Sequence, residues 1–183
     1  MNEPARIVAD WLNDVTSSAT SVADIIALSD FPKDAADSLP TAPVIYDSSR
    51  NGFAARGVFP KDGSVTYPCI VVGFVGLRYE NFRKTHDSNA KLQQGEATVT
   101  VTIAHRLQDS DEGVEDVGYL VRATKGSLDV LHGPTKLAAR TRNGISLLHL
   151  TALTMGNVRA EDDDKLIGTQ FVLTYATHET TPD

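Results

Sequence analysis

The stretch 95–131 constrains the fold more than any other part of the sequence. Between residues 96 and 104, threonines alternate with apolar, largely β-branched residues, a pattern typical of a strand with one buried face. After a polar turn at 108–113, apolar residues recur at helical spacing as far as Leu131. The stretch therefore predicts a strand followed by a helix that packs back on the strand's apolar face.

The apolar stripe marks the face of this helix that we expect to be buried. It consists of Val114, Val117, Val121, Leu128 and Leu131, with Leu120 and Ala123 at its edge. Gly118 and Gly126 also lie in the helix, where each costs up to ~1 kcal/mol relative to alanine. Close approach of the helix to the sheet is one reason to keep them. His132-Gly133-Pro134 predicts the helix end.

The first part of the chain predicts two helices and a loop. The apolar stripe of the N-terminal helix consists of Val8, Leu12 and Val15, with Trp11 beside them. A second helix is predicted to begin at Ser21, because Asp24 stands three residues later and can complete a capping box. Residues 33–43 are rich in Pro, Asp, Ala and Ser, which is typical of a surface loop.

Strands follow between residues 44 and 82. Val44-Ile45-Tyr46 is short, whereas 69–75 is a continuous apolar run, which suggests a strand buried on both faces or at an interface. Residues 77–82 alternate between apolar and polar and predict a half-exposed strand. Residues 83–94 are charged and amide-rich without an apolar pattern, and predict a long hairpin loop.

Two long strands are predicted at 145–155 and 166–177, joined as an antiparallel hairpin by the charged segment 159–165. We expect the strand 166–177 to be a long edge strand that invites pairing with another chain. His149 lies in an apolar strand and is expected to be a core or interface residue. The polar residues 178–183 predict a loose tail.

This order of elements predicts the α+β class. Because strands cluster before and after one helix, we expect a mostly antiparallel sheet with one long central helix packed on one face and an N-terminal helix. Length and composition, with 41% hydrophobic and 22% charged residues, are ordinary for one domain over residues 1–183. No apolar run approaches the ~18 residues that span a bilayer, so we expect no membrane contact.

Few residues carry recognisable chemistry. The carboxylates at 161–164 could hold a divalent cation, although adjacent acids in a hairpin tip are more often a solvated turn. Lys136, Arg140 and Arg142 could form a phosphate-binding patch. Cys69 lies in an apolar strand and is expected to be a small buried side chain rather than a nucleophile.

The sequence contains no nucleophile-elbow, P-loop or dinucleotide-binding motif. We therefore expect a structural or binding protein, not an enzyme, with no catalytic residues, cofactor or metal. The net charge of −7 argues against a protein that grips nucleic acid through its whole surface.

Several patterns occur together along most of the chain. They are the N-terminal amphipathic helix, Val44-Ile45-Tyr46, the segment Tyr67-Pro68-Cys69-Ile70-Val71-Val72, the strand from Thr98 to Ala104 with its short acidic loop, Leu131-His132 at the helix end, and the aromatic alternation from Phe171 to Tyr175. This arrangement resembles the tail terminator, or tail completion, proteins of long-tailed bacteriophages and their minor-tail-protein relatives.

The resemblance implies a structural virion protein that forms a ring, commonly a hexamer, at the head-proximal end of the tail tube. Such a ring stops tube growth, joins the tail to the head connector and lets genomic DNA pass through its lumen. The implied partners are copies of the chain itself, the tail tube protein and the connector, with assembly in the host cytoplasm. An acidic net charge suits this role, because a lumen that repels phosphate lets DNA slide.

We expect neighbours and partners to be touched at the 83–94 loop and at the last hairpin. The candidate interface residues are Arg83, Lys84, Lys91, Glu161, Asp162, Asp163, Asp164, Phe171 and Tyr175. Two other readings stay open. One is a head-side neck adaptor or other minor tail protein, and the other, with less support, is a metal-dependent enzyme that uses the acidic cluster at 161–164.

Overall fold

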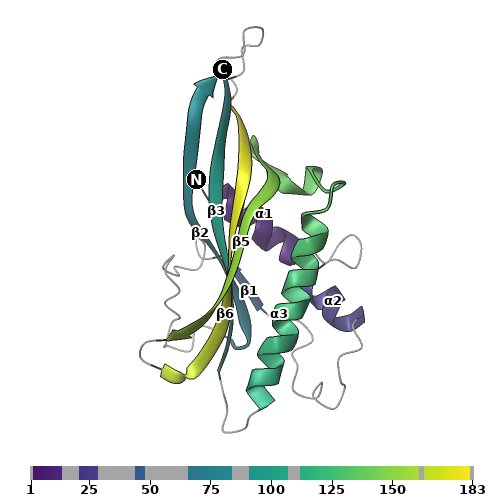
Figure 1. Cartoon of the computed structure of the whole chain (residues 1–183). Helices are drawn as coiled ribbons and strands as arrows, with labels where there is room; N and C mark the ends of the chain where they lie inside the picture. The colour runs from purple at the N-terminus through teal and green to yellow at the C-terminus, as the bar shows by residue number, and fades with distance from the viewer. Residues whose placement is uncertain are drawn as a thin grey trace.

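The computed structural model is built around one six-stranded sheet with helices on one face (Figure 1). It describes residues 2–13, 21–28, 44–47, 66–83, 91–106, 112–160 and 163–181. The strands are β1 (Val44–Asp47), β2 (Cys69–Arg83), β3 (Lys91–Arg106), β4 (Thr141–Arg142), β5 (Ile145–Ala160) and β6 (Asp163–Thr181). The helices are α1 (Glu3–Leu12), α2 (Val22–Leu28) and α3 (Glu112–Leu131), with a short 3-10 helix η1 (Ala138–Arg140).

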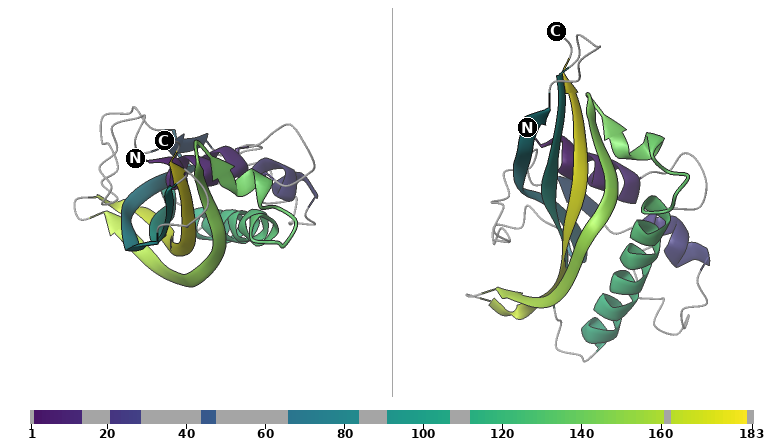
Figure 2. Two further views of the ribbon diagram at one scale, coloured as in Figure 1. Left: turned by 90° about the horizontal axis from the view of Figure 1, so that it is seen from above. Right: turned by 45° about the horizontal axis from the view of Figure 1, so that its top comes forward.

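The strand order is β1-β2-β3-β6-β5-β4, and each described pairing is antiparallel except that of β1 with β2. The predicted α+β class and mostly antiparallel sheet are therefore confirmed. Seen from above, the sheet is strongly curved, and α3 lies beside it with its axis nearly along the line of sight (Figure 2).

The alternation in β3 places its apolar side chains and its threonines on opposite faces as predicted, but the prediction of a single buried face was wrong, because residues 99–104 are buried on both faces. Ala97, Val99, Val101 and Ile103 are fully buried in the core on the helix-covered face. The threonines lie on the opposite face, where Thr102 accepts a hydrogen bond of 2.9 Å from the side-chain amide of Gln170 on β6.

β6 lies inside the sheet, between β3 and β5. Its pairing with β3 runs from Leu166 to Thr181, and its pairing with β5 from Asp163 to Glu179. The prediction of an edge strand at 166–177 was wrong, because alternation reports which face is buried and says nothing about lateral neighbours. The predicted loose tail was also wrong for residues 178–181, which belong to β6.

β2 is one strand with a bulge where two strands were predicted. Phe74 pairs with Val99 and Gly76 with Thr98, which leaves Val75 as the extra residue of the bulge. Val75 is 57% exposed, so the apolar run is not buried as far as its end.

The hairpin between β2 and β3 is longer than predicted, and its loop is shorter. Arg83 still pairs with Leu92, and β3 begins at Lys91. Residues 91–94 of the predicted 83–94 loop are therefore strand. Residues 84–90, like the predicted surface loop at 33–43, lie outside the described part of the chain.

Three helices form the layer, and it is not organised by one long central helix. Helix α1 buries almost its whole length, with Pro4, Ala5, Ile7, Val8, Ala9, Trp11 and Leu12 enclosed. The indole N–H of Trp11 donates a 2.9 Å hydrogen bond to the carbonyl of Ser127, which ties α1 to α3. The physical reason for this difference is that the curved sheet offers a wider apolar face than a single helix can cover.

The predicted start of the second helix is confirmed by its capping box. The backbone N–H of Asp24 donates to the Ser21 hydroxyl at 3.1 Å, and the Ser21 N–H donates to the Asp24 carboxylate at 3.2 Å. Helix α2 packs on α3, where Ile25 lies 3.5 Å from the position that a Cβ would take at Gly126.

Helix α3 ends at Leu131 as predicted, but its buried face is rotated from the predicted stripe. Leu120 and Ala123 are fully buried, whereas Val121 is only partly buried. Close approach of α3 to the sheet explains neither Gly118 nor Gly126. A Cβ at Gly118 would meet nothing within 4 Å, and Gly126 faces α2.

Candidate interaction surfaces

The charged interface candidates lie at the two ends of the sheet. Arg83 and Lys91 sit at the end where β2 and β3 form their hairpin. Asp163 and Asp164 begin β6 at the opposite end, ~60 Å away along a strand that rises ~3.3 Å per residue. The structure therefore does not bring the basic and acidic candidates together. Lys84, Glu161 and Asp162 lie outside the described residues.

Phe171 and Tyr175 are core residues, and their prediction as interface residues was wrong. They are 1% and 0% exposed, on the same face of β6 as Leu173. The Tyr175 hydroxyl lies 2.6 Å from Nε2 of His132, just past the end of α3. Burial raises the pKa of Tyr175 and lowers that of His132, so the pair is held neutral.

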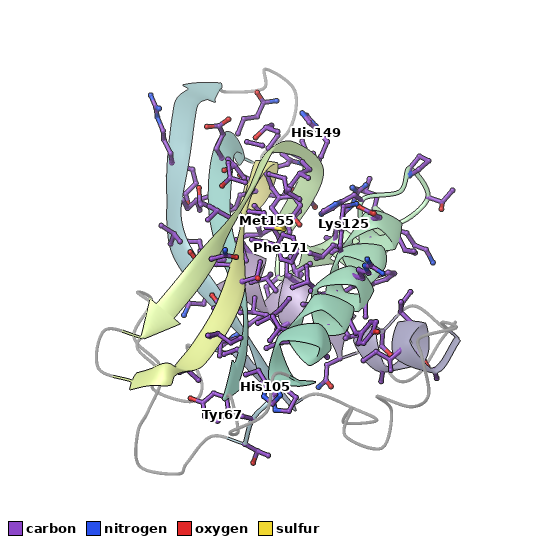
Figure 3. The ribbon with its side chains drawn as sticks, turned by 60° about the horizontal axis from the view of Figure 1, so that its bottom comes forward. Tyr67, His105, Lys125, His149, Met155 and Phe171 are labelled. Atoms are coloured by element: carbon purple, nitrogen blue, oxygen red, sulfur yellow. The ribbon has the colours of Figure 1, made fainter. Side chains whose placement is uncertain are left out.

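Leu153 and Met155 form an exposed apolar surface on β5, which we call the β5 apolar edge. They are 39% and 62% exposed, although they lie on the helix-bearing face and pair with the buried Leu173 and Phe171 of β6. Figure 3 shows Met155 close to Phe171. The helices cover β6 but do not extend over this part of β5. In the same strand His149 is exposed, so of the two predicted roles, core or interface residue, the core role is wrong.

The long strands β2 and β5 have an outer strand neighbour, β1 or β4, along only a short part of their length. β4 pairs with Ile145 and Ser146 of β5, and β1 pairs with Cys69–Val72 of β2. Within the described part of the chain, the remaining length of β2 and of β5 has a strand neighbour on one side only. Such edges carry unpaired backbone N–H and C=O groups that can pair with another chain.

The sheet face opposite the helices carries an uncharged grid, which we call the threonine face. It consists of three rows of cross-strand neighbours on β3, β6 and β5: Thr102, Gln170 and Gly156; Thr100, Val172 and Thr154; Thr98, Thr174 and Ala152. None of these nine residues is charged, and four of the five threonines belong to β3 or its neighbour β6. The threonine alternation in β3 was visible in the sequence, but the rows require the strand order.

A pocket of about 340 Å³ lies between α1 and the segment of η1 and β4. Asp10, Trp11 and Arg142 are among its lining residues. Arg142 forms ion pairs with Asp10 and, at 2.9 Å, with Glu3, so its charge is used within the fold.

The predicted phosphate patch is therefore divided. Arg142 is paired with α1, and the Lys136 ammonium lies 5.4 Å from the centre of the Trp11 ring. Arg140, in contrast, is buried.

Cys69 is fully buried in β2, as predicted. Burial raises the pKa of its thiol to about 12, so the side chain stays protonated and packs as a small apolar group. Among the residues that the structure describes, no group of three or more His, Cys, Asp or Glu could hold a metal ion. The acidic cluster at 161–164 falls partly outside those residues. None of the described helices is long and apolar enough to cross a membrane.

Neither the scan against protein-family models nor the search of curated proteins gives a match for this sequence. Function is therefore inferred from the surfaces of this chain itself.

Proposed function

We propose that this chain is a structural protein of a phage tail that assembles as a ring, with six copies, at the head-proximal end of the tail tube. The ring ends tube polymerisation and joins the tail to the head connector. The observation that carries the proposal is that the described strands form a sheet with two different open edges, one on β2 and one on β5. Contact between two different surfaces of identical chains is heterologous, and it closes into a ring when the rotation per copy allows.

The β5 apolar edge supports such a contact. Leu153 and Met155 expose apolar area beside backbone groups of β5 that have no strand neighbour among the described residues. A neighbouring copy that pairs with this edge buries the apolar side chains and forms hydrogen bonds with the backbone groups at the same time.

The accessible part of the threonine face, which includes Thr154 and Thr174 but not the buried Thr100 and Thr102, suits a surface past which DNA moves. DNA is held mainly by Lys and Arg on its phosphates, and the nine residues of this face include neither. Hydroxyl and small side chains offer only weak, neutral contacts. We propose that this face points toward the lumen, while the basic and acidic ends of the sheet meet the two different partners, tube and connector.

Light scattering on the purified full chain tests the ring. Six copies of 19.7 kDa give a particle of about 118 kDa. Met155→Glu should reduce this mass to that of a monomer, because it places a charge in the proposed contact. Leu137→Glu is the matched control, since Leu137 is also an exposed apolar residue, at 48%, and lies outside β5, directly before η1.

Rings with a central hole in end-on electron micrographs would agree with the proposal. A chain that stays monomeric at the highest concentration reachable, and that leaves the length of polymerising tail tubes unchanged, contradicts it.

A further inference from the structure

Arg140 is a buried cation that has no counter-ion among the described side chains. It is 5% exposed, and it is the only Lys or Arg among the described side chains that is buried. Its Nε is closed off from solvent and has no hydrogen-bond partner. Its backbone N–H, in contrast, is satisfied by the carbonyl of Leu137 at 3.0 Å.

The pairing of β4 with β5 agrees with an inward direction of this side chain. Arg142 lies opposite Ile145 and Thr141 opposite Ser146, and extending this register by one residue brings Arg140, the last residue of η1, opposite the fully buried Leu147. Directly opposed residues in an antiparallel pair share one face of the sheet. Arg140 therefore faces the core side, and its charge acts on both His132 and Tyr175.

The described carboxylates of α1 and the last turns of α3 are engaged elsewhere. Asp129 of α3 pairs with Lys125 at 2.6 Å. Glu3 and Asp10 of α1 both pair with Arg142. The nearest polar pair, His132 and Tyr175, is bonded to itself and carries no negative charge. Among the described side chains, none supplies Arg140 with a counter-ion, in a protein whose net charge is −7.

A buried charge is tolerated in proteins when it is paired, and an unpaired one strongly disfavours the folded state. The guanidinium group is planar, always charged, and matches the geometry of carboxylate and phosphate oxygens. We propose that Arg140 is the receptor for an oxyanion, which binds its terminal nitrogens and supplies the missing negative charge. The anion is either a free phosphate from solution or a side-chain carboxylate of a second copy, and this proposal stands whether or not the assembly is a tail ring.

Thermal unfolding of the full chain tests this site with inorganic phosphate as the probe. The reference buffer is Tris chloride at the same ionic strength, so that general salt effects cancel. Phosphate well above its Kd should raise the melting temperature by about 2–4 °C or more. Arg140→Met should abolish the rise, because methionine fills a similar volume without charge. Arg122→Met on the exposed side of α3 is the matched control and should retain it.

Protein concentration separates the two sources of the anion. If a second copy supplies a carboxylate, then in Tris chloride the melting temperature and the mass both rise with concentration, and Arg140→Met loses both effects. If free phosphate is the ligand, the rise with phosphate is independent of protein concentration.

Nitrogen-15 NMR of the wild-type chain provides a readout that needs no variant. If free phosphate is the ligand, the Nε–H signal of Arg140 should shift on phosphate titration. If a second copy supplies the carboxylate, the signal should shift with protein concentration. Both measurements are possible even if Arg140→Met does not fold. An equal response of wild type and Arg140→Met to phosphate overturns the proposal. So does the absence of any response, thermal or spectroscopic, to both phosphate and concentration.

Discussion

Gly168 offers a sharp test of how closely the two central strands approach. It lies on β6 opposite Ala104 of β3. A Cβ at Gly168 would sit 2.3 Å from the carbonyl oxygen of Ile103, and real Cβ atoms essentially never come closer than 3.0 Å to such an atom. The oxygen belongs to the backbone and cannot rotate away. We therefore expect that Gly168→Ala forces β3 and β6 apart and strains their hydrogen bonds.

Overpacking of this kind costs about 1–3 kcal/mol. For a chain of this length each kcal/mol lowers the melting temperature by about 2–4 °C. Circular dichroism during heating, combined with urea unfolding at fixed temperature, measures both quantities on the same sample.

Gly118→Ala is the matched control, because it is the same substitution at an exposed helix position with nothing within 4 Å of the new Cβ. It should stabilise the protein by up to ~1 kcal/mol through helix propensity alone. A Gly168→Ala protein that melts at or above the wild-type temperature would refute the reasoning, since β3 and β6 could not then be packed as described.

Two further predictions concern the buried pair at the end of α3. Tyr175→Phe removes the hydroxyl that lies 2.6 Å from His132, and urea unfolding should show a loss of about 1 kcal/mol; an unchanged midpoint would mean that the hydrogen bond contributes nothing. Burial lowers the pKa of His132 below its ordinary 6.5, so below pH 6.5 the unfolded chain binds a proton that the folded protein does not, and stability should fall as the pH falls through that range. His132→Gln should flatten this dependence, and an identical slope in the variant would assign the effect to other groups.

The strands and helices could be predicted because each buries one face. In β3 the alternation of threonine and valine separates the two faces of the strand: the valines enter the core, although Thr100 and Thr102 on the other face are also buried. Ser21 and Asp24 predict the start of α2, because they form a capping box between residues only three positions apart. Information of this kind is local, so it survives in the sequence alone.

The lateral order of the strands could not be predicted. Nothing local to β6 indicates that β3 and β5 flank it, so its sequence fits an edge strand and an interior strand equally well. The same holds for the interface candidates on this strand. Phe171 and Tyr175 share the side of β6 that carries Leu173, and this alternation indicates core residues, whereas a position at an interface depends on neighbours that the strand itself does not encode.

Arg140 shows a different limit of local patterns. In the sequence it stands between Lys136 and Arg142 and resembles part of an exposed basic patch. Arg140 ends η1 directly before β4, and the pairing of β4 with β5 fixes this segment against the sheet. Its burial depends on a contact with a neighbouring strand, which no spacing within 136–142 encodes.

The position of β6 also governs the order in which the sheet can form. Both of its neighbours, β3 and β5, precede it in the chain. While the chain is being synthesised, β3 and β5 therefore exist before the strand that joins them, with open edges and with the alternating valines and threonines of β3 uncovered. Such segments aggregate readily when left unpaired. The polypeptide is consequently most vulnerable between the synthesis of β5 and that of β6, and substitutions that slow the closure of their hairpin should reduce the yield of folded protein even when they leave its final stability unchanged.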